Sequence, residues 1–224
     1  YTPFQLAYLK YNFPRAKFTM LGDLNQAIFT KDESRSLLKQ ISGLFDPKKT
    51  DVVQLTKSYR STKEITDFTK QILRQGEKIE AFNRRGPKPA LWGRSTEQEA
   101  IEALVKILDK NNENQRTTAV ITKDLASAKQ VAEQLKQKGE KATLIATANQ
   151  RLVPGTLVVP SYLAKGLEFD AVVMWDASKE NYHKVDETQL VYTITSRAMY
   201  ELDIIYIGEK SPLLDVDSDT YVEK

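Results

Sequence analysis

The sequence contains no cysteine and a single histidine, His183, among its 224 residues. The lack of cysteine excludes disulfide bonds, thiolate zinc sites and a cysteine nucleophile. One histidine also argues against a histidine-based metal site or a serine–histidine–aspartate triad. No apolar run approaches the roughly 18 residues that a membrane-spanning helix needs, and no secretory signal opens the chain. We therefore expect a cytoplasmic protein without a membrane span.

Glycine is scarce as well, at 9 residues, and the glycine-rich nucleotide loops are missing. Neither the phosphate loop G-x-x-x-x-G-K-[ST] nor the dinucleotide pattern G-x-G-x-x-G occurs. The run 171–176 imitates a strand ending in a magnesium-binding aspartate, but we interpret it as an ordinary strand end because no phosphate loop precedes it. If this chain handles nucleotides, it cannot form the whole site alone.

The composition that remains is typical of a globular protein. Hydrophobic residues make up 41% of the chain and charged residues 28%. The formal net charge of +3 is at most a weak indication of a polyanionic partner.

Apolar spacing predicts four amphipathic helices. They cover residues 61–73, 97–110, 124–138 and 186–200, and a weaker pattern covers 34–44. Ser61 and Glu64 have the spacing of a capping box, and Gly139 is a usual residue just past a helix end.

Seven short β-rich runs alternate with these helices. They are residues 18–21, 51–55, 118–122, 142–145, 156–160, 170–175 and 202–207. Several are apolar nearly throughout, as strands buried on both faces should be. The alternation predicts βαβ units and an α/β fold with an open parallel sheet flanked by helices. The tail from 211 onward carries four acidic residues and is expected to be mobile.

Two polar segments stand out in the first part of the chain. Gly22-Asp23-Leu24-Asn25-Gln26 directly follows the first predicted strand, and Gln26 can donate to a phosphate oxygen or orient a water. Ser58-Tyr59-Arg60-Ser61 opens a predicted helix. Tyr59 offers a flat face for a base, and Arg60 a fork of donors for phosphate. Taken singly, these segments are better explained as a strand-to-turn connection and as a capped helix with a surface arginine.

Two further segments lie near the C-terminus. In Ala164-Lys165-Gly166-Leu167-Glu168-Phe169-Asp170, Gly166 allows a close backbone approach, Lys165 could meet a phosphate and Glu168 could accept from ribose hydroxyls. In the run 190–198, apolar residues fix one helix face to the core and would mount Arg197 rigidly, as a transferred phosphoryl group requires. The alternatives are a loop entering a buried strand and a snorkelling arginine.

In their order and spacing, these four segments resemble the third to sixth motifs of the superfamily-one DNA helicases of the UvrD, Rep and PcrA type. The most specific matches are Lys165-Gly166-Leu167-Glu168-Phe169 and the threonine-x-arginine-alanine-like ending at Thr195-Ser196-Arg197-Ala198. Such helicases bind ATP between two RecA-like domains. The resemblance therefore implies the second motor domain of a P-loop NTPase-type fold, without the Walker A loop.

The resemblance also implies a division of the chain. Residues 1–57 would end the first RecA-like domain, 58–210 would form the second, and 211–224 would be the tail. The phosphate loop and the ligands of Mg²⁺ would lie on an N-terminal helicase domain in cis, so this chain alone is expected to be inactive. In the shared ATP site, Gln26 would sense the γ-phosphate.

The remaining roles follow motif by motif. Tyr59 would stack on adenine, and Arg60 would contact phosphate. Glu168, with Gly166, would contact the ribose. Arg197 would reach across the domain interface as an arginine finger.

The DNA-facing motif departs from the family pattern. Before Lys165 the family has threonine-x-histidine, whereas here the chain reads Ser161-Tyr162-Leu163-Ala164. Ser161, Tyr162 and Lys165 are nevertheless the expected contacts to single-stranded DNA. The interval 139–156 leaves no room for the large helical insertion of the best-known members, so the chain looks closest to helicase IV and the HelD group. The leading interpretation is thus an ATP-dependent DNA helicase or translocase. The alternatives are an ATP-driven remodelling factor for RNA polymerase and an inactive α/β interaction module.

Overall fold

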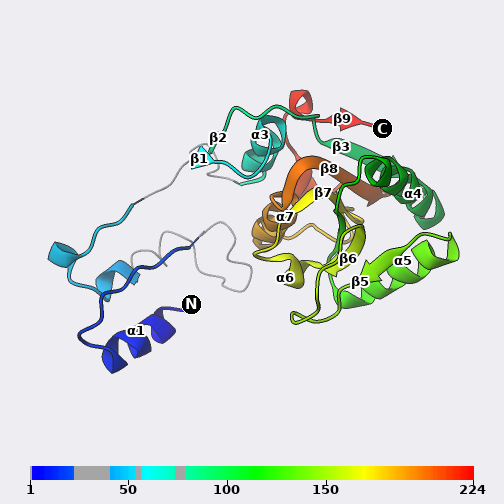
Figure 1. The fold of residues 1–224 in the computed structure, drawn as a ribbon. Coiled ribbons are helices and arrows are strands. Elements are labelled where there is room, and N and C mark those ends of the chain that lie inside the picture. Colours follow the sequence, from blue (N-terminus) through cyan, green and yellow to red (C-terminus); the bar gives the residue numbers. More distant parts are fainter. Residues whose placement is uncertain (1, 23–40, 54–56, 74–78) are drawn as a thin grey trace. The chain divides into compact units, whose positions relative to one another are not determined.

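The chain forms two compact units in a computed structural model, Tyr1–Leu55 and Thr56–Lys224 (Figure 1). The structure describes residues 2–22, 41–53, 57–73 and 79–224.

The first unit contains helix α1 (Pro3–Asn12) and a 3₁₀ turn, η2 (Pro47–Lys49). Thr2 begins α1 with a capping box, since its hydroxyl accepts from the Gln5 N–H at 3.2 Å and the Gln5 side chain accepts from the Thr2 N–H. The rings of Phe18 and Phe45 pack with centroids 5.6 Å apart.

The strand predicted at 18–21 does not form, and residues 51–53 of the second predicted strand are also irregular. Strands need a hydrogen-bonded neighbour, and the described part of this unit supplies none. Most of the helix predicted at 34–44 lies outside the described residues.

The second unit is built on a seven-stranded sheet whose order is β5-β6-β4-β7-β8-β3-β9. Its strands are β3 (Ala90–Arg94), β4 (Thr118–Thr122), β5 (Ala142–Leu144), β6 (Thr156–Pro160), β7 (Phe169–Met174), β8 (Ala198–Ile207) and β9 (Val222–Glu223). Every neighbouring pair in this sheet is parallel. A separate parallel pair joins β1 (Lys57–Ser58) and β2 (Glu80–Ala81). The predicted α/β fold with a parallel sheet is confirmed.

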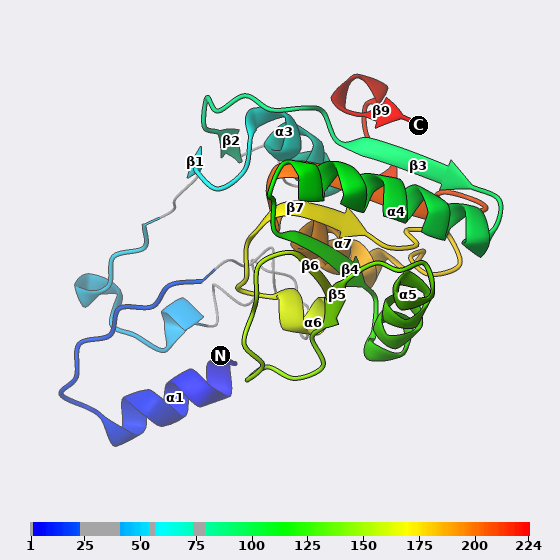
Figure 2. The same ribbon diagram turned by 45° about the vertical axis from the view of Figure 1, so that its right-hand side comes forward.

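Helices cover both faces of the sheet (Figure 2). They are α3 (Lys63–Ile72), α4 (Glu97–Glu113), α5 (Leu125–Gln137), α6 (Ser161–Ala164) and α7 (Thr188–Thr195). Successive side chains of a strand point to opposite faces of the sheet, so alternate residues enter two separate hydrophobic cores. Val120 and Val173 pack under α4 and α5, whereas Ile121 and Val172 pack under α3 and α7. Strands buried on both faces explain the nearly continuous apolar runs in the sequence.

The predicted central elements agree with the structure to within a few residues, but one helix boundary is wrong and one strand beside β8 was missed. The last predicted helix, 186–200, ends at Thr195, and β8 already begins at Ala198. Strand β3 was not predicted. Strand β8 pairs with β7 on one side and with β3 on the other. In both places this pairing outweighs the secondary structure that the local sequence pattern favours.

The capping box predicted at the start of α3 is absent. Thr62 is the residue that precedes this helix, without a side-chain cap. The Ser61 hydroxyl donates instead to the Ala198 carbonyl oxygen at 2.6 Å, and Glu64 accepts from the Gly86 N–H at 2.8 Å. Both side chains that were predicted to form the capping box therefore bond to backbone groups elsewhere in the domain.

The C-terminal segment 211–224 packs against the domain, contrary to the free tail expected from its acidic composition. Leu214 is fully buried, and Val222 opens the short strand β9 beside β3. The Tyr221 ring meets Phe68 of α3 edge-on, with centroids 6.1 Å apart. A few apolar residues between the acidic ones therefore anchor the segment.

Removing the N-cap of α5 should measurably destabilise the second unit. Asp124 Oδ1 accepts from the Ser127 N–H at 2.8 Å, and this bond lowers the pKa of Asp124 below 3.8. We expect Asp124→Ala to lower the free energy of unfolding by about 1 kcal/mol in urea titrations.

Asp124→Asn is the matched control, because asparagine also caps helices. The stabilisation by the Asp124 carboxylate is present above pH 3.8 and is lost as the pH falls through its lower folded pKa. The asparagine variant should lack this pH dependence. Equal stability of all three proteins at neutral pH would contradict the capping role.

Candidate functional site

Three segments that are far apart in the sequence meet at the amino ends of β7 and β8. The Phe169 N–H donates to the Arg197 carbonyl oxygen at 3.1 Å, and the Thr62 N–H donates to the Met199 carbonyl oxygen at 3.0 Å. These backbone bonds bring the segments that carry Arg60, Glu168 and Arg197 side by side.

Arg60 and Glu168 form an ion pair across this junction. Arg60 Nε donates to Glu168 Oε1 at 2.5 Å, and the two side chains are 34% and 44% exposed. An ion pair this exposed contributes at most about 1 kcal/mol to stability. Both groups can therefore turn to a ligand at little cost, which is consistent with a cation for phosphate and an acceptor for hydroxyl groups.

Arg197 lies in the connection between α7 and β8 and not on the helix where the sequence analysis placed it. Its side chain is 1% exposed. Nε donates to the Thr193 carbonyl oxygen at 3.0 Å, and Nη1 donates to the Leu167 carbonyl oxygen at 3.2 Å. Arg197 is thus held against the backbone of the residue next to Glu168, and its guanidinium group faces the protein interior.

Tyr59 presents an exposed aromatic ring beside Arg60, with 64% of its surface in solvent. The ring of Phe82 packs against it, with centroids 5.1 Å apart and planes inclined at 39°. The sequence analysis did not single out Phe82, because its local sequence shows no motif. Only the pairing of β1 with β2 brings it to Tyr59.

Gly166 forms the turn between α6 and β7. Its φ of +86° lies in the left-handed region that glycine adopts without strain, and a Cβ there would meet no atom within 4 Å. The backbone is therefore open to a close approach. Lys165 is exposed next to it.

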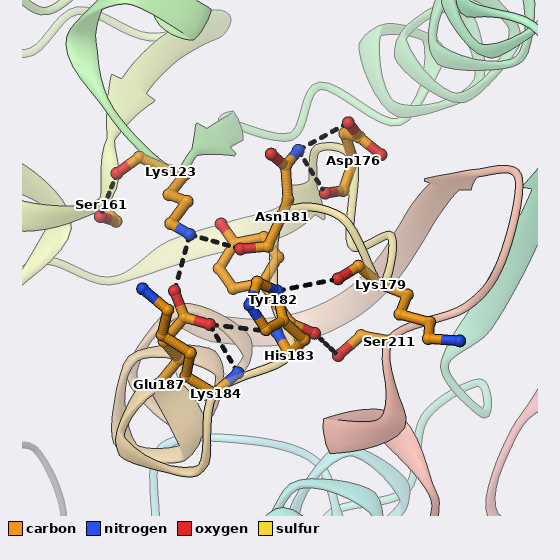
Figure 3. A network of polar contacts seen from close by, with 10 residues as sticks. All are labelled: Lys123, Ser161, Asp176, Lys179, Asn181, Tyr182, His183, Lys184, Glu187 and Ser211. Carbon is orange, nitrogen blue, oxygen red and sulfur yellow. Dashed lines mark hydrogen bonds and ion pairs between the residues drawn. The ribbon is translucent and has the colours of Figure 1, made fainter.

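A polar network occupies the opposite, carboxyl end of the sheet, after β4, β6 and β7 (Figure 3). Lys123, which follows β4, donates to Glu187 Oε1 at 2.6 Å and also to the Asn181 carbonyl oxygen. Asn181 donates in turn to Asp176 Oδ2 at 2.6 Å. The Lys123 ammonium lies 5.1 Å from the centroid of the Tyr182 ring. The Lys123 ammonium thus ties the loop that leaves β4 to the segment that follows β7.

The surroundings shift the pKa values of this network in opposite directions. Burial raises the pKa of Asp176 and of the fully buried Tyr182 hydroxyl. Burial also opposes ionisation of Glu187, but the Lys123 ammonium and backbone N–H groups outweigh it, so the pKa of Glu187 is lowered. Glu187 therefore remains ionised at neutral pH.

The residues expected to contact DNA divide between the interior and the surface. Ser161 is buried, and its hydroxyl donates to the Lys123 carbonyl oxygen at 2.7 Å, within the network. Tyr162 is 41% exposed, and Lys165 is exposed. The structure therefore places Tyr162 and Lys165 where a ligand could reach them and uses Ser161 internally.

A solved structure provides the decisive comparison. The chain is 47% identical to the C-terminal domain of a possible DNA helicase from Lactobacillus plantarum WCFS1, with a TM-score of 0.67. The match covers 74% of this chain and 98% of that one. The chain belongs to this family of helicase C-terminal domains. No family model and no curated protein matches the chain.

Family membership agrees with the RecA-like architecture of the second unit. Of the residues expected to line the ATP site of such a helicase domain, Gln26 lies outside the described residues. The structure brings Arg60, Glu168 and the Arg197 segment together, with Tyr59 next in sequence to Arg60. The sequence analysis missed Phe82, Lys123 and Glu187.

Two kinds of feature are absent from the part of the chain that the structure describes. Within residues 2–22, 41–53, 57–73 and 79–224, no three acidic or histidine side chains are grouped so that they could hold a metal ion. In the same part of the chain, no helix combines the length and the apolar character needed to cross a bilayer.

Proposed function

We propose that this chain is the C-terminal motor half of an ATP-dependent DNA helicase or translocase. It would supply one wall of an ATP site, and the phosphate loop and the Mg²⁺ ligands would come from an N-terminal helicase domain in cis. The observation that carries the proposal is the Arg60–Glu168 pair, which joins two motif-bearing segments at the surface in a chain 47% identical to a helicase C-terminal domain.

The described residues would form one side of the nucleotide site. Tyr59 offers an exposed ring for adenine, and the neighbouring Arg60 offers a half-exposed guanidinium group for phosphate. Glu168 and the open backbone at Gly166 would face the ribose. Gln26 keeps its proposed role as γ-phosphate sensor through the sequence motif alone.

Arg197 would act as the arginine finger. Its guanidinium group is turned inward onto the Thr193 and Leu167 carbonyl oxygens, so it must leave them to reach a phosphate. The Leu167 contact lies next to Glu168, so a ligand that displaces Glu168 would also disturb the position of Arg197. Closure of the two motor domains would then complete the site, as in other enzymes whose catalytic groups assemble on closure.

The region around α6 would contact single-stranded DNA. Tyr162 on α6 and Lys165 directly after it are exposed, and they offer a stacking ring and a cation for the backbone. The Lys123–Glu187 pair ties this region to the start of α7, whose other end leads to Arg197. These contacts would link the proposed DNA contacts to the proposed arginine finger.

We expect the complete protein to hydrolyse ATP at a rate that rises strongly with single-stranded DNA, whereas this chain alone shows only background turnover. The reason is the missing phosphate loop, without which the β- and γ-phosphates and Mg²⁺ are not held. A coupled ATPase assay on both proteins, with and without DNA, measures the difference. Turnover by the pure chain above background would refute the split site.

The alternative is an ATP-driven factor that remodels or recycles RNA polymerase, as in the HelD group. Two observations favour it. Ser161-Tyr162-Leu163-Ala164 replaces the family's DNA-contacting motif, and the connection from Leu144 to Thr156 contains no helix. Co-purification with RNA polymerase together with weak stimulation by DNA would favour this function over the first.

A further inference from the structure

The aromatic pair Tyr59–Phe82 lies at the surface and not in a core. The ring centroids are 5.1 Å apart, within the range of about 4.5–7 Å over which aromatic rings attract each other. Tyr59 is 64% exposed and Phe82 is 43% exposed. The pair therefore buries little surface for stability, and its geometry calls for another explanation.

Backbone pairing fixes Phe82 beside Tyr59. In the β1–β2 pair, Ser58 lies opposite Ala81, and the Phe82 N–H donates to the Ser58 carbonyl oxygen at 3.0 Å. The residue after Tyr59 is anchored as well, because Arg60 is bound to Glu168. Tyr59 is thus held on both sides along the chain, and its ring is held by Phe82.

An aromatic ring has two faces, and Phe82 packs against one side of Tyr59. The high exposure of Tyr59 shows that much of the ring still meets solvent. A flat surface supported from one side is suited to stacking on a second flat ring. A purine, with two fused rings, overlaps such a surface more extensively than a pyrimidine does.

We propose that Phe82 is a positioning residue that holds the Tyr59 ring for a purine base, so that the pair selects purine over pyrimidine nucleoside triphosphates. The inference rests on the proposed function, in which Tyr59 contacts the base. It adds the residue that enforces the preference for a purine base. Phe82 itself acts through Tyr59 and does not contact the phosphates.

Steady-state hydrolysis of ATP and CTP by the complete protein tests this role in Phe82→Ala, Phe82→Leu and Phe82→Tyr. Loss of the ring pair should raise the KM for ATP about two- to tenfold and leave kcat within about twofold. The preference for ATP over CTP should fall in parallel. Phe82→Tyr retains the ring and should behave like the wild type. Phe82→Leu retains apolar bulk but has no ring, so it tests the loss of the ring in a folded variant.

Tyr59→Ala and the Tyr59→Ala/Phe82→Ala double variant separate the possible failures. If Phe82 acts through Tyr59, the double variant should have the same KM as Tyr59→Ala. A raised KM in Tyr59→Ala with a normal KM in both Phe82→Ala and Phe82→Leu would overturn the role of Phe82 and leave the proposed ATP site intact. An unchanged KM in Tyr59→Ala would overturn the base contact and this inference together. If the KM of the double variant exceeded that of Tyr59→Ala by the whole factor measured for Phe82→Ala alone, the two residues would act independently. That result would also overturn the inference.

Discussion

Replacing Arg197 by alanine in the complete protein should lower ATP turnover by at least about 10²-fold, a lower bound set beneath the effect of about 10³–10⁵-fold known for arginine fingers. The expected loss is in kcat, because a cation that meets the transferred phosphoryl group stabilises the transition state more than bound ATP. Arg197→Lys should recover little of the rate, since an ammonium group lacks the planar fork of donors. Steady-state ATPase assays with single-stranded DNA give both values.

Because Arg197 is also buried, its removal has a structural effect that must be separated from catalysis. The alanine variant leaves the Thr193 and Leu167 carbonyl oxygens without these donors. Arg116→Ala is the matched control, as it removes an arginine ion-paired to Glu201 on β8, outside the proposed site. It should lower stability and leave turnover near the wild-type value. A folded Arg197→Ala protein with unchanged kcat would remove Arg197 from the ATP site.

Leu214→Ala should lower the free energy of unfolding by about 2–5 kcal/mol, the usual effect of truncating a buried leucine. Leu214 is fully buried in the core that also contains Phe68 and Leu91. The C-terminal segment therefore contributes to the domain and is not a tail that can be removed freely. Urea unfolding followed by tryptophan fluorescence measures the change, because both tryptophans of the chain, Trp92 and Trp175, lie in the second unit.

Val222→Ala is the control for this segment. Val222 is 40% exposed, so its truncation should change the free energy of unfolding by about 0.5 kcal/mol or less. If Leu214→Ala were equally mild, the segment would behave as the mobile tail that its acidic composition suggests. A large effect of Leu214→Ala alone shows that burial, and not the charge of the neighbours, governs the segment.

The amphipathic helices and the buried strands could be predicted because their signal is local. The run 118–122 and the run 156–160 match β4 and β6 residue by residue, since central strands of a parallel sheet are apolar on both faces. Gly139, at φ +85°, follows the C-terminal end of α5 as expected. The predicted strand at 18–21 failed for the converse reason, because an apolar run becomes a strand only where a partner strand is present.

The sequence by itself determined the α/β class, the residue types of the candidate site and the resemblance that led to the helicase family. Motif order and hydrophobic period are properties of the chain that need no coordinates. Tertiary structure decided which of these residues meet. It paired Arg60 with Glu168, turned Arg197 inward and set Phe82 against Tyr59. It also anchored the C-terminal segment on the core through Leu214. Contacts of this kind join residues distant in sequence, and only the register of strands and the packing of helices fix them.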